Sequence, residues 1–181
     1  AVLKAGKPVY VEKPMTIHAA SAEIMMNAVE EVKGKLSVAH YRRAQPLFKK
    51  IKQLVADQAI GEVRFARLSL YKKSYTQQDL NFEKTAWRVD PALAGGGLFH
   101  DLSPHQLDLV YYFLGEPAES FGFSNNQAGI YPADDMVTGN ILFKTGVQFS
   151  GIWCFNVAEK DEEDRCEIVG DKGKITFSFF E

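Results

Sequence analysis

The chain has 181 residues, of which 46% are hydrophobic and 24% charged, an ordinary composition for a globular protein. Its formal net charge of -2 gives no electrostatic basis for binding nucleic acid or an anionic membrane, and no apolar run reaches the roughly 18–20 residues of a membrane span. No signal-peptide pattern opens the sequence, and Cys154 and Cys166 lack metal-ligand spacing, so we expect two reduced thiols in a cytoplasmic protein.

The first part of the chain has the pattern of a strand, a helix and a second strand. Residues 9–11 form a short apolar run typical of a buried parallel strand, and residues 36–40 form another. Apolar residues recur at helical spacing over residues 17–32, with Thr16 as a candidate N-cap and Gly34 as the stop. This order predicts the tail of a doubly wound, Rossmann-type parallel sheet. Because the chain opens on what looks like the end of a helix, we expect a fragment of a longer protein.

The second part begins with a predicted helix from Pro46 to Gly61, whose inner face is predicted to carry Leu47, Ile51, Leu54 and Val55. A long strand, a polar loop over residues 74–94 and a helix ending at Gly115 follow. The remaining predicted strands are 119–125, 136–143, 147–155, 166–169 and 175–180. We therefore expect an α/β (α+β) chain in which residues 1–43 are the remnant of a dinucleotide-binding domain. Residues 44–181 then form a domain with a mainly antiparallel open sheet and helices on one face.

The most informative stretch is residues 95–108, where Asp101, His105 and Asp108 follow one another at spacings of four and three. On a helix these residues share one face, and burying ionisable groups is costly unless they are paired or used. His105 and Asp101 are candidates for a proton-transferring pair. The alternative is structural: Asp101 caps the helix, Pro104 stands at its start and His105 is a satisfied core histidine. Asp108 either supports His105 or anchors a loop.

Two further readings of this stretch are weaker. Adjacent His100 and Asp101 point about 100° apart on a helix, so they do not converge with His105 on one metal ion. The triple glycine, residues 95–97, lacks the spacing of a dinucleotide fingerprint, and we expect it to allow a close backbone approach before the helix.

Lys13 stands directly before Pro14, which favours an extended backbone at the lysine. At the carboxyl end of a parallel strand, such a lysine points toward the ligand crevice of an α/β sheet. Arg42 and Arg43 follow the second strand, where they form an exposed charge cluster or reach a ligand.

Taken in order, these motifs resemble the Gfo/Idh/MocA-type oxidoreductases, named for glucose–fructose oxidoreductase and inositol dehydrogenase. The resemblance rests on the motifs Glu12-Lys13-Pro14, Tyr41-Arg42-Arg43, Ile60-Gly61-Glu62-Val63, Trp87-Arg88, the triple glycine and Asp101-x3-His105-x2-Asp108. It covers nearly the whole chain, although the glycine-rich first turn of the family's Rossmann domain is missing from these residues.

The resemblance implies an enzyme that transfers a hydride between NAD or NADP and a sugar-like or polyol hydroxyl carbon. It implies Lys13, Asp101 and His105 as catalytic residues. It places Trp87, Arg88 and Asp101 at the substrate, and Glu12, Lys13, Pro14 and Arg42 at the cofactor. It also implies a homodimer or homotetramer built through the sheet. Because the phosphate-binding turn is missing, we expect this fragment alone not to bind the cofactor tightly, to carry none, and to be inactive.

Two alternatives remain open from the sequence. One is an NAD-using glycoside hydrolase on the same scaffold, and the other is a sugar-sensing regulator without catalysis. The joint presence of Lys13, Asp101 and His105 argues against the regulator.

Overall fold

The computed structural model describes residues 1–180, and the chain divides into two units, Ala1–Tyr41 and the residues from Arg42 onward. The first unit contains strands β1 (Val9–Val11) and β2 (Leu36–Val38), which pair in parallel. Helix α1 (Ala19–Glu31) connects them, and a short 3-10 turn, η1 (Leu3–Ala5), precedes β1. This is the strand–helix–strand arrangement that the sequence predicts.

Helix α1 differs from its prediction at its start. It begins at Ala19 after His18, and the Thr16 hydroxyl donates to the carbonyl of His18 at 2.8 Å instead of capping the helix. The prediction of Thr16 as N-cap is therefore wrong. No residue of α1 is buried, and Ile24 on its apolar stripe is 69% exposed.

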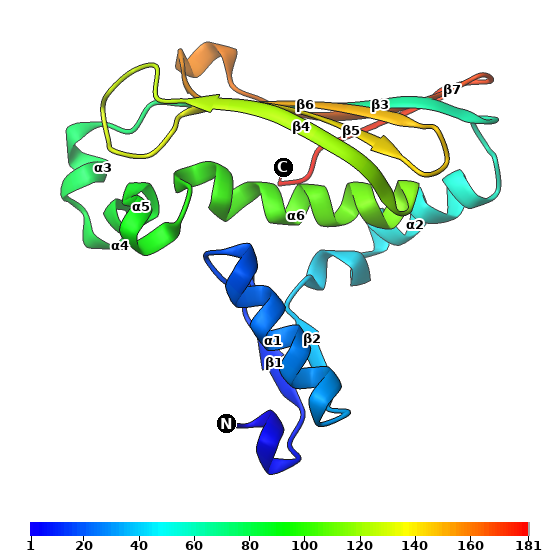
Figure 1. Ribbon diagram of the computed structural model, residues 1–181. Coiled ribbons are helices and arrows are strands. Elements are labelled where there is room, and N and C mark those ends of the chain that lie inside the picture. The colour runs from blue at the N-terminus through cyan, green and yellow to red at the C-terminus, as the bar shows by residue number, and fades with distance from the viewer. Residues whose placement is uncertain (181) are drawn as a thin grey trace. The chain divides into compact units, whose positions relative to one another are not determined.

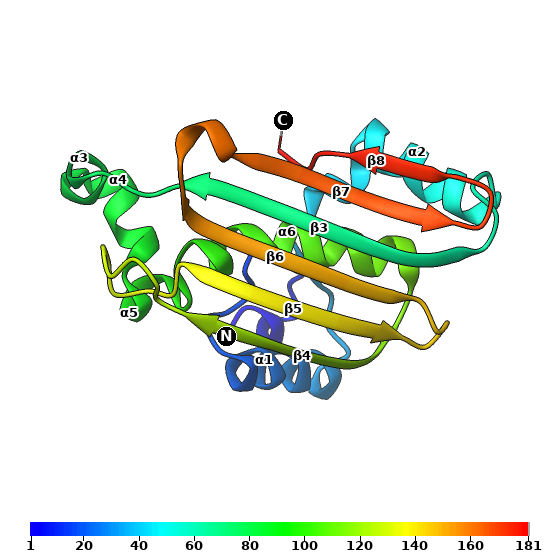
Figure 2. The same ribbon diagram turned by 90° about the horizontal axis from the view of Figure 1, so that it is seen from above.

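The second unit is built on one six-stranded sheet. Its strands are β3 (Val63–Lys73), β4 (Pro117–Asn125), β5 (Met136–Phe143), β6 (Gln148–Val157), β7 (Glu163–Gly170) and β8 (Lys174–Phe177). They lie in the order β4-β5-β6-β3-β7-β8, with β3 and β6 parallel and all other neighbours antiparallel (Figure 2). The predicted mainly antiparallel open sheet is confirmed.

Helices α2 (Pro46–Ala56) and α6 (Gly97–Leu114) cover one face of this sheet (Figure 1). The shorter segments are the 3-10 turns η2 (Tyr41–Ala44), η3 (Trp87–Val89) and η4 (Glu159–Asp161), and the helices α3 (Gln77–Asn81), α4 (Glu83–Ala86) and α5 (Pro91–Ala94). Four of them occupy the stretch that the sequence predicts as a polar loop over residues 74–94.

The core lies between the sheet and the two long helices. Alternate residues of β3, namely Ala66, Leu68 and Leu70, are buried on this face, as the period of two of a strand requires. From α2, the ring of Phe48 packs against Phe113 of α6, and Phe177 and Phe179 lie on its other sides. The buried residues of α2 are Phe48 and Ile51, whereas Leu47 is half exposed, so the predicted inner face of this helix is wrong at its first position.

Strand β8 ends at Phe177, three residues before its predicted end. The backbone N–H groups of Phe179 and Phe180 donate to the carboxylate of Asp164 at 2.9 and 2.6 Å. The Asp164 carboxylate thus accepts the hydrogen bonds that a neighbouring strand would otherwise accept, and strand pairing ends at this point.

Two remaining expectations concern thiols and membranes. Cys154 and Cys166 are both free. Among residues 1–180, no helix combines the length and the hydropathy that crossing a bilayer requires.

Candidate functional site

Helix α6 carries the predicted catalytic stripe and begins at Gly97. Gly97 has a φ of 66°, and a Cβ placed on it would lie 2.5 Å from the Cβ of Ala133 in the loop between β4 and β5. The predicted close approach at the triple glycine is confirmed. Because the helix starts here, Asp101 and Pro104 both lie inside it, and the alternative that makes them a cap and a helix start is wrong.

Asp101 is paired with an arginine from the preceding 3-10 turn. The Nε of Arg88 donates to Oδ2 of Asp101 at 3.2 Å, and both side chains are partly buried. The Arg88 guanidinium also lies 4.9 Å from the centre of the Trp87 ring. The Trp87 indole is 43% exposed and is held by a hydrogen bond to the Lys84 carbonyl. The three predicted substrate residues therefore lie together at the N-terminal half of α6.

Tyr75 lies near the same group and has no recognisable signal in the sequence. Burial raises the pKa of Tyr75, and the positive charge of Arg88 opposes that shift. Its ring packs edge-on against Tyr131 at 6.0 Å between centroids. Tyr75 is therefore an additional candidate site residue near Arg88 and Asp101.

His105 stands one helical turn after Asp101 and is 7% exposed. Its ring lies edge-on to Phe180, with centroids 6.1 Å apart and planes at 78°. The Phe180 ring also contacts Arg42, whose guanidinium carbon lies 4.7 Å from the centre of that ring. The Nη1 of Arg42 donates a hydrogen bond to the Phe179 carbonyl at 2.6 Å. The predicted cofactor role of Arg42 stays a prediction.

Asp108 is held by Arg43 in a bidentate ion pair. The Nε and Nη2 of Arg43 donate to the two carboxylate oxygens at 2.8 and 2.6 Å. This hydrogen bond raises the pKa of Arg43, although partial burial of the guanidinium opposes the shift. Of the two roles open for Asp108, the geometry supports the anchor, because it fastens α6 to η2 at the start of the second unit.

The remaining predicted residues belong to the first unit. Glu12, Lys13 and Pro14 follow directly on β1, at the carboxyl end of the parallel pair, and the Lys13–Pro14 peptide is cis. Lys13 and Pro14 are half-buried, whereas Glu12 is exposed. The convergence of Lys13 with Asp101 and His105 stays a prediction.

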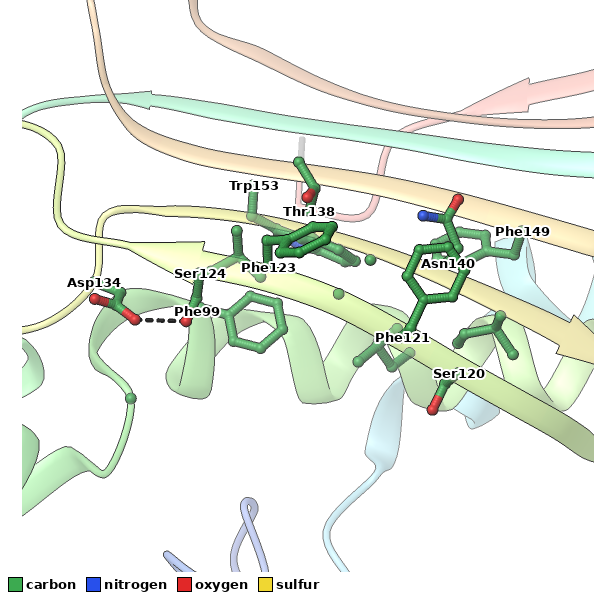
Figure 3. A pocket seen from close by; sticks show the side chains of 16 residues that line it. Phe99, Ser120, Phe121, Phe123, Ser124, Asp134, Thr138, Asn140, Phe149 and Trp153 are labelled. Atoms are coloured by element: carbon green, nitrogen blue, oxygen red, sulfur yellow. Dashed lines mark hydrogen bonds between the residues drawn. The ribbon is translucent and has the colours of Figure 1, made fainter.

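A cavity of about 450 Å³ opens on another side of α6, beneath β4 and β5 (Figure 3). Its floor is made by Phe99 and Trp153, whose indole donates to the buried amide of Gln106 at 2.7 Å. Gly151 leaves room for that indole, since a Cβ there would lie 2.2 Å from the ring. None of Trp87, Arg88, Asp101 or His105 lines this cavity, so it is separate from the catalytic candidates. No cluster of three metal-ligating side chains occurs among residues 1–180.

Comparison with known proteins defines the class. The model of the GFO/IDH/MocA C-terminal domain matches residues 48–176. This match spans most of the chain, which therefore belongs to the Gfo/Idh/MocA family of oxidoreductases.

Individual relatives agree with this assignment. The chain is 40% identical to oxidoreductase P35 of Formosa agariphila over 178 residues, covering 98% of this chain and 54% of that protein. The crystal structure of aldose-aldose oxidoreductase from Caulobacter crescentus complexed with glycerol superposes with a TM-score of 0.79 at 26% identity, covering 97% of this chain and 50% of that one. An inositol dehydrogenase homolog complexed with NAD+ from Azotobacter vinelandii shares the fold, with a TM-score of 0.84 at 20% identity over 98% of this chain and 47% of that one. The chain thus spans about half the length of the proteins that it matches.

Proposed function

We propose that this chain supplies the substrate side of an NAD- or NADP-dependent oxidoreductase that acts on a sugar-like or polyol hydroxyl. The observation that carries the proposal is the pair Asp101 and His105, one turn apart on α6, in a chain of this family. Hydride departs from a hydroxyl-bearing carbon only as the hydroxyl proton is removed, so the site needs a base at that oxygen. His105 is that base in the proposal.

Asp101 and its neighbours bind and orient the substrate. The Asp101 carboxylate, held by Arg88, accepts hydrogen bonds from substrate hydroxyls, and the exposed Trp87 ring offers an apolar face to a sugar ring. Lys13 donates from its ammonium group to the reacting oxygen and steadies the negative charge that develops there. In this proposal each residue therefore contacts one part of the substrate: a hydroxyl group, the sugar ring or the reacting oxygen.

The residues at the end of β1 suit the nicotinamide end of the cofactor. Ligands of open α/β sheets bind beyond the carboxyl ends of parallel strands, and Glu12, Lys13 and Pro14 occupy that position after β1. A bound nicotinamide supplies the hydride acceptor or donor. We expect the 181 residues alone to bind NAD or NADP only weakly, because no glycine-rich phosphate-binding turn is present in them.

The experiment uses the complete protein that carries this chain. The change His105→Ala should lower the turnover number by about 10²- to 10⁴-fold, and Lys13→Ala should act in the same direction. The assay follows reduction of the nicotinamide by absorbance across a panel of polyols and aldoses. Glycoside cleavage without net reduction of the cofactor would instead support the hydrolase, and unchanged turnover in His105→Ala would refute the assigned base.

We also propose a homo-oligomer built through the open face of the sheet, in a cytoplasmic protein. On that face Phe121, Phe123 and Ile152 are exposed, and cross-strand pairing places Phe123, Thr138 and Ile152 in one row. Two free cysteines suit a reducing compartment. Phe123→Glu should dissociate the oligomer in sedimentation velocity, whereas Phe82→Glu, which alters an exposed phenylalanine of another region, should not. A monomeric wild-type protein would refute this part.

A further inference from the structure

Beyond β8, a polar clamp fixes the backbone of Phe179 and Phe180. The carboxylate of Asp164 accepts from the N–H groups of Phe179 and Phe180, and Arg42 donates to the carbonyl of Phe179. Asp164 pairs in register with Leu70, a fully buried residue of β3, so it lies on the face of the sheet that α6 covers. Three hydrogen bonds from two separate elements thus hold two consecutive residues.

The two phenylalanines have different surroundings. Phe179 is 3% exposed and packs into the core, 6.0 Å from the Phe48 ring and 5.2 Å from the Phe177 ring. Phe180 is only half-buried, and its ring meets the imidazole of His105 edge-on. Phe180 packs at the edge of the core, and the same half-buried ring lies beside a candidate catalytic base.

The Phe180 ring also contacts a cation. The guanidinium of Arg42 lies over the Phe180 ring at 4.7 Å while it donates to the Phe179 carbonyl. The same ring therefore touches Arg42 and His105. The other charged groups on the His105 stripe are each held by a partner: Asp101 binds Arg88, and Asp108 binds Arg43.

We propose that Phe180 is a positioning residue that holds the imidazole of His105 in one orientation and keeps the Arg42 guanidinium away from it. A base transfers a proton efficiently only when its ring points at the substrate oxygen, and a small misplacement is costly in rate. The contact requires an aromatic ring of this size, because a branched aliphatic side chain has neither the reach nor the flat edge that meets His105. The effect of Phe180 on catalysis rests on the function proposed above, whereas the effect of Phe180 on the orientation of the His105 ring does not.

The first experiment therefore uses the 181-residue chain and needs no turnover. Long-range ¹H–¹⁵N spectra resolve the ring resonances of the four histidines, and His105→Gln identifies those of His105. In Phe180→Leu we expect the His105 resonances to move and broaden as the ring samples several orientations, with the other three histidines unchanged. Phe180→Tyr should restore the sharp resonances, because it keeps the aromatic ring.

The control is Phe179→Leu, which loses an aromatic ring from the adjacent clamped residue but no contact with His105. We expect it to lower the melting temperature and to leave the His105 resonances in place. Superimposable His105 resonances in Phe180→Leu and the wild type would overturn the proposal, and so would an equal disturbance in Phe179→Leu.

The second experiment measures kinetics in the complete enzyme. Phe180→Leu should lower kcat by about 10- to 100-fold with little change in KM, and Phe180→Tyr should recover most of it. A loss confined to KM would overturn the positioning role. If the wild-type enzyme shows no oxidoreductase activity, the proposed function fails, and the spectra of the first experiment still decide whether Phe180 orients His105.

Discussion

The two units of the chain differ most in how much apolar surface each one buries. Of residues 1–41, all of which the structure describes, the buried apolar side chains are those of Leu3 and Ala39. In the second unit, sheet and helices enclose a continuous core that includes Phe48, Phe149 and Trp153. A unit of about 40 residues rarely sustains a core of its own, whereas a unit of about 140 residues does.

This difference separates the tasks of the two units in the proposed enzyme. Asp101 and His105 stand on a helix whose opposite sides are packed into the core, so their positions are set by many contacts. Lys13 follows directly on the first strand of a two-stranded sheet, and the helix after it has no buried residue. Within these 181 residues, the second unit thus holds its candidate catalytic groups by core packing, whereas residues 1–41 bury few apolar side chains.

The largest test of this contrast compares two apolar truncations. Phe48→Ala removes a ring that is 1% exposed and touches three other aromatic rings, and we expect it to lower the free energy of unfolding by about 3–5 kcal/mol. Ile24→Ala, on the exposed side of α1, should change it by less than about 0.5 kcal/mol. Urea denaturation of the 181-residue chain measures both. Equal losses of unfolding free energy in the two variants would mean that α1 is covered in solution, and would contradict the difference in burial between the two units.

A second test compares one ion pair from each unit. Asp108→Asn breaks the bidentate pair with Arg43, in which the carboxylate side chain is 10% exposed, and should cost about 1–2 kcal/mol. Glu31→Gln breaks the pair with Lys4, in which both side chains are 63% exposed, and should cost less than about 0.5 kcal/mol. The same denaturation assay applies, with Asp108→Ala as a check that the loss does not come from the asparagine itself. A cost for Glu31→Gln as large as that for Asp108→Asn would contradict the argument from burial.

The same contrast explains what the sequence can predict. Periodicity is a local signal, so it correctly predicts the strands of the sheet, the long helix and the shared face of Asp101 and His105. Partners that are distant in sequence leave no such signal: Arg43 and Asp108 are 65 positions apart, and Arg42 and Phe179 are 137 apart. For that reason the sequence leaves Asp108 with two possible roles and predicts a strand at Phe180.

Periodicity also predicts an apolar face without saying what covers it. The stripe on α1 is apolar in sequence, yet within its own unit it buries nothing. On α2 the amphipathic pattern is strong, but Phe48 rather than Leu47 enters the core, because the rings of Phe113, Phe177 and Phe179 surround that position. The pattern thus locates the helix, and tertiary packing selects the residue.

A last prediction concerns the open face of the sheet and the dependence of its stability on pH. Glu167 is 1% exposed there, and Lys174, Arg165 and Arg67 all donate to its carboxylate. The hydrogen bond from Lys174, followed by those from Arg165 and Arg67, lowers the pKa of Glu167 far below its ordinary value of 4.5. A carboxyl whose pKa is lowered by folding stabilises the folded state fully when the pH is above its ordinary, unfolded-state pKa. This contribution is lost as the pH falls below that value toward the lowered, folded-state pKa.

Glu167→Gln should therefore be less stable than the wild type at pH 7, and the difference should shrink as the pH falls from about 5 toward 2. Thermal unfolding at a series of pH values measures the difference in stability. Glu30→Gln, which removes one negative charge from the exposed helix α1, controls for net charge and should show no such convergence. A difference that stays constant over this range would mean that the three cations do not act on Glu167 as a carboxylate. The cluster would then hold the open face together through packing of their long side chains alone.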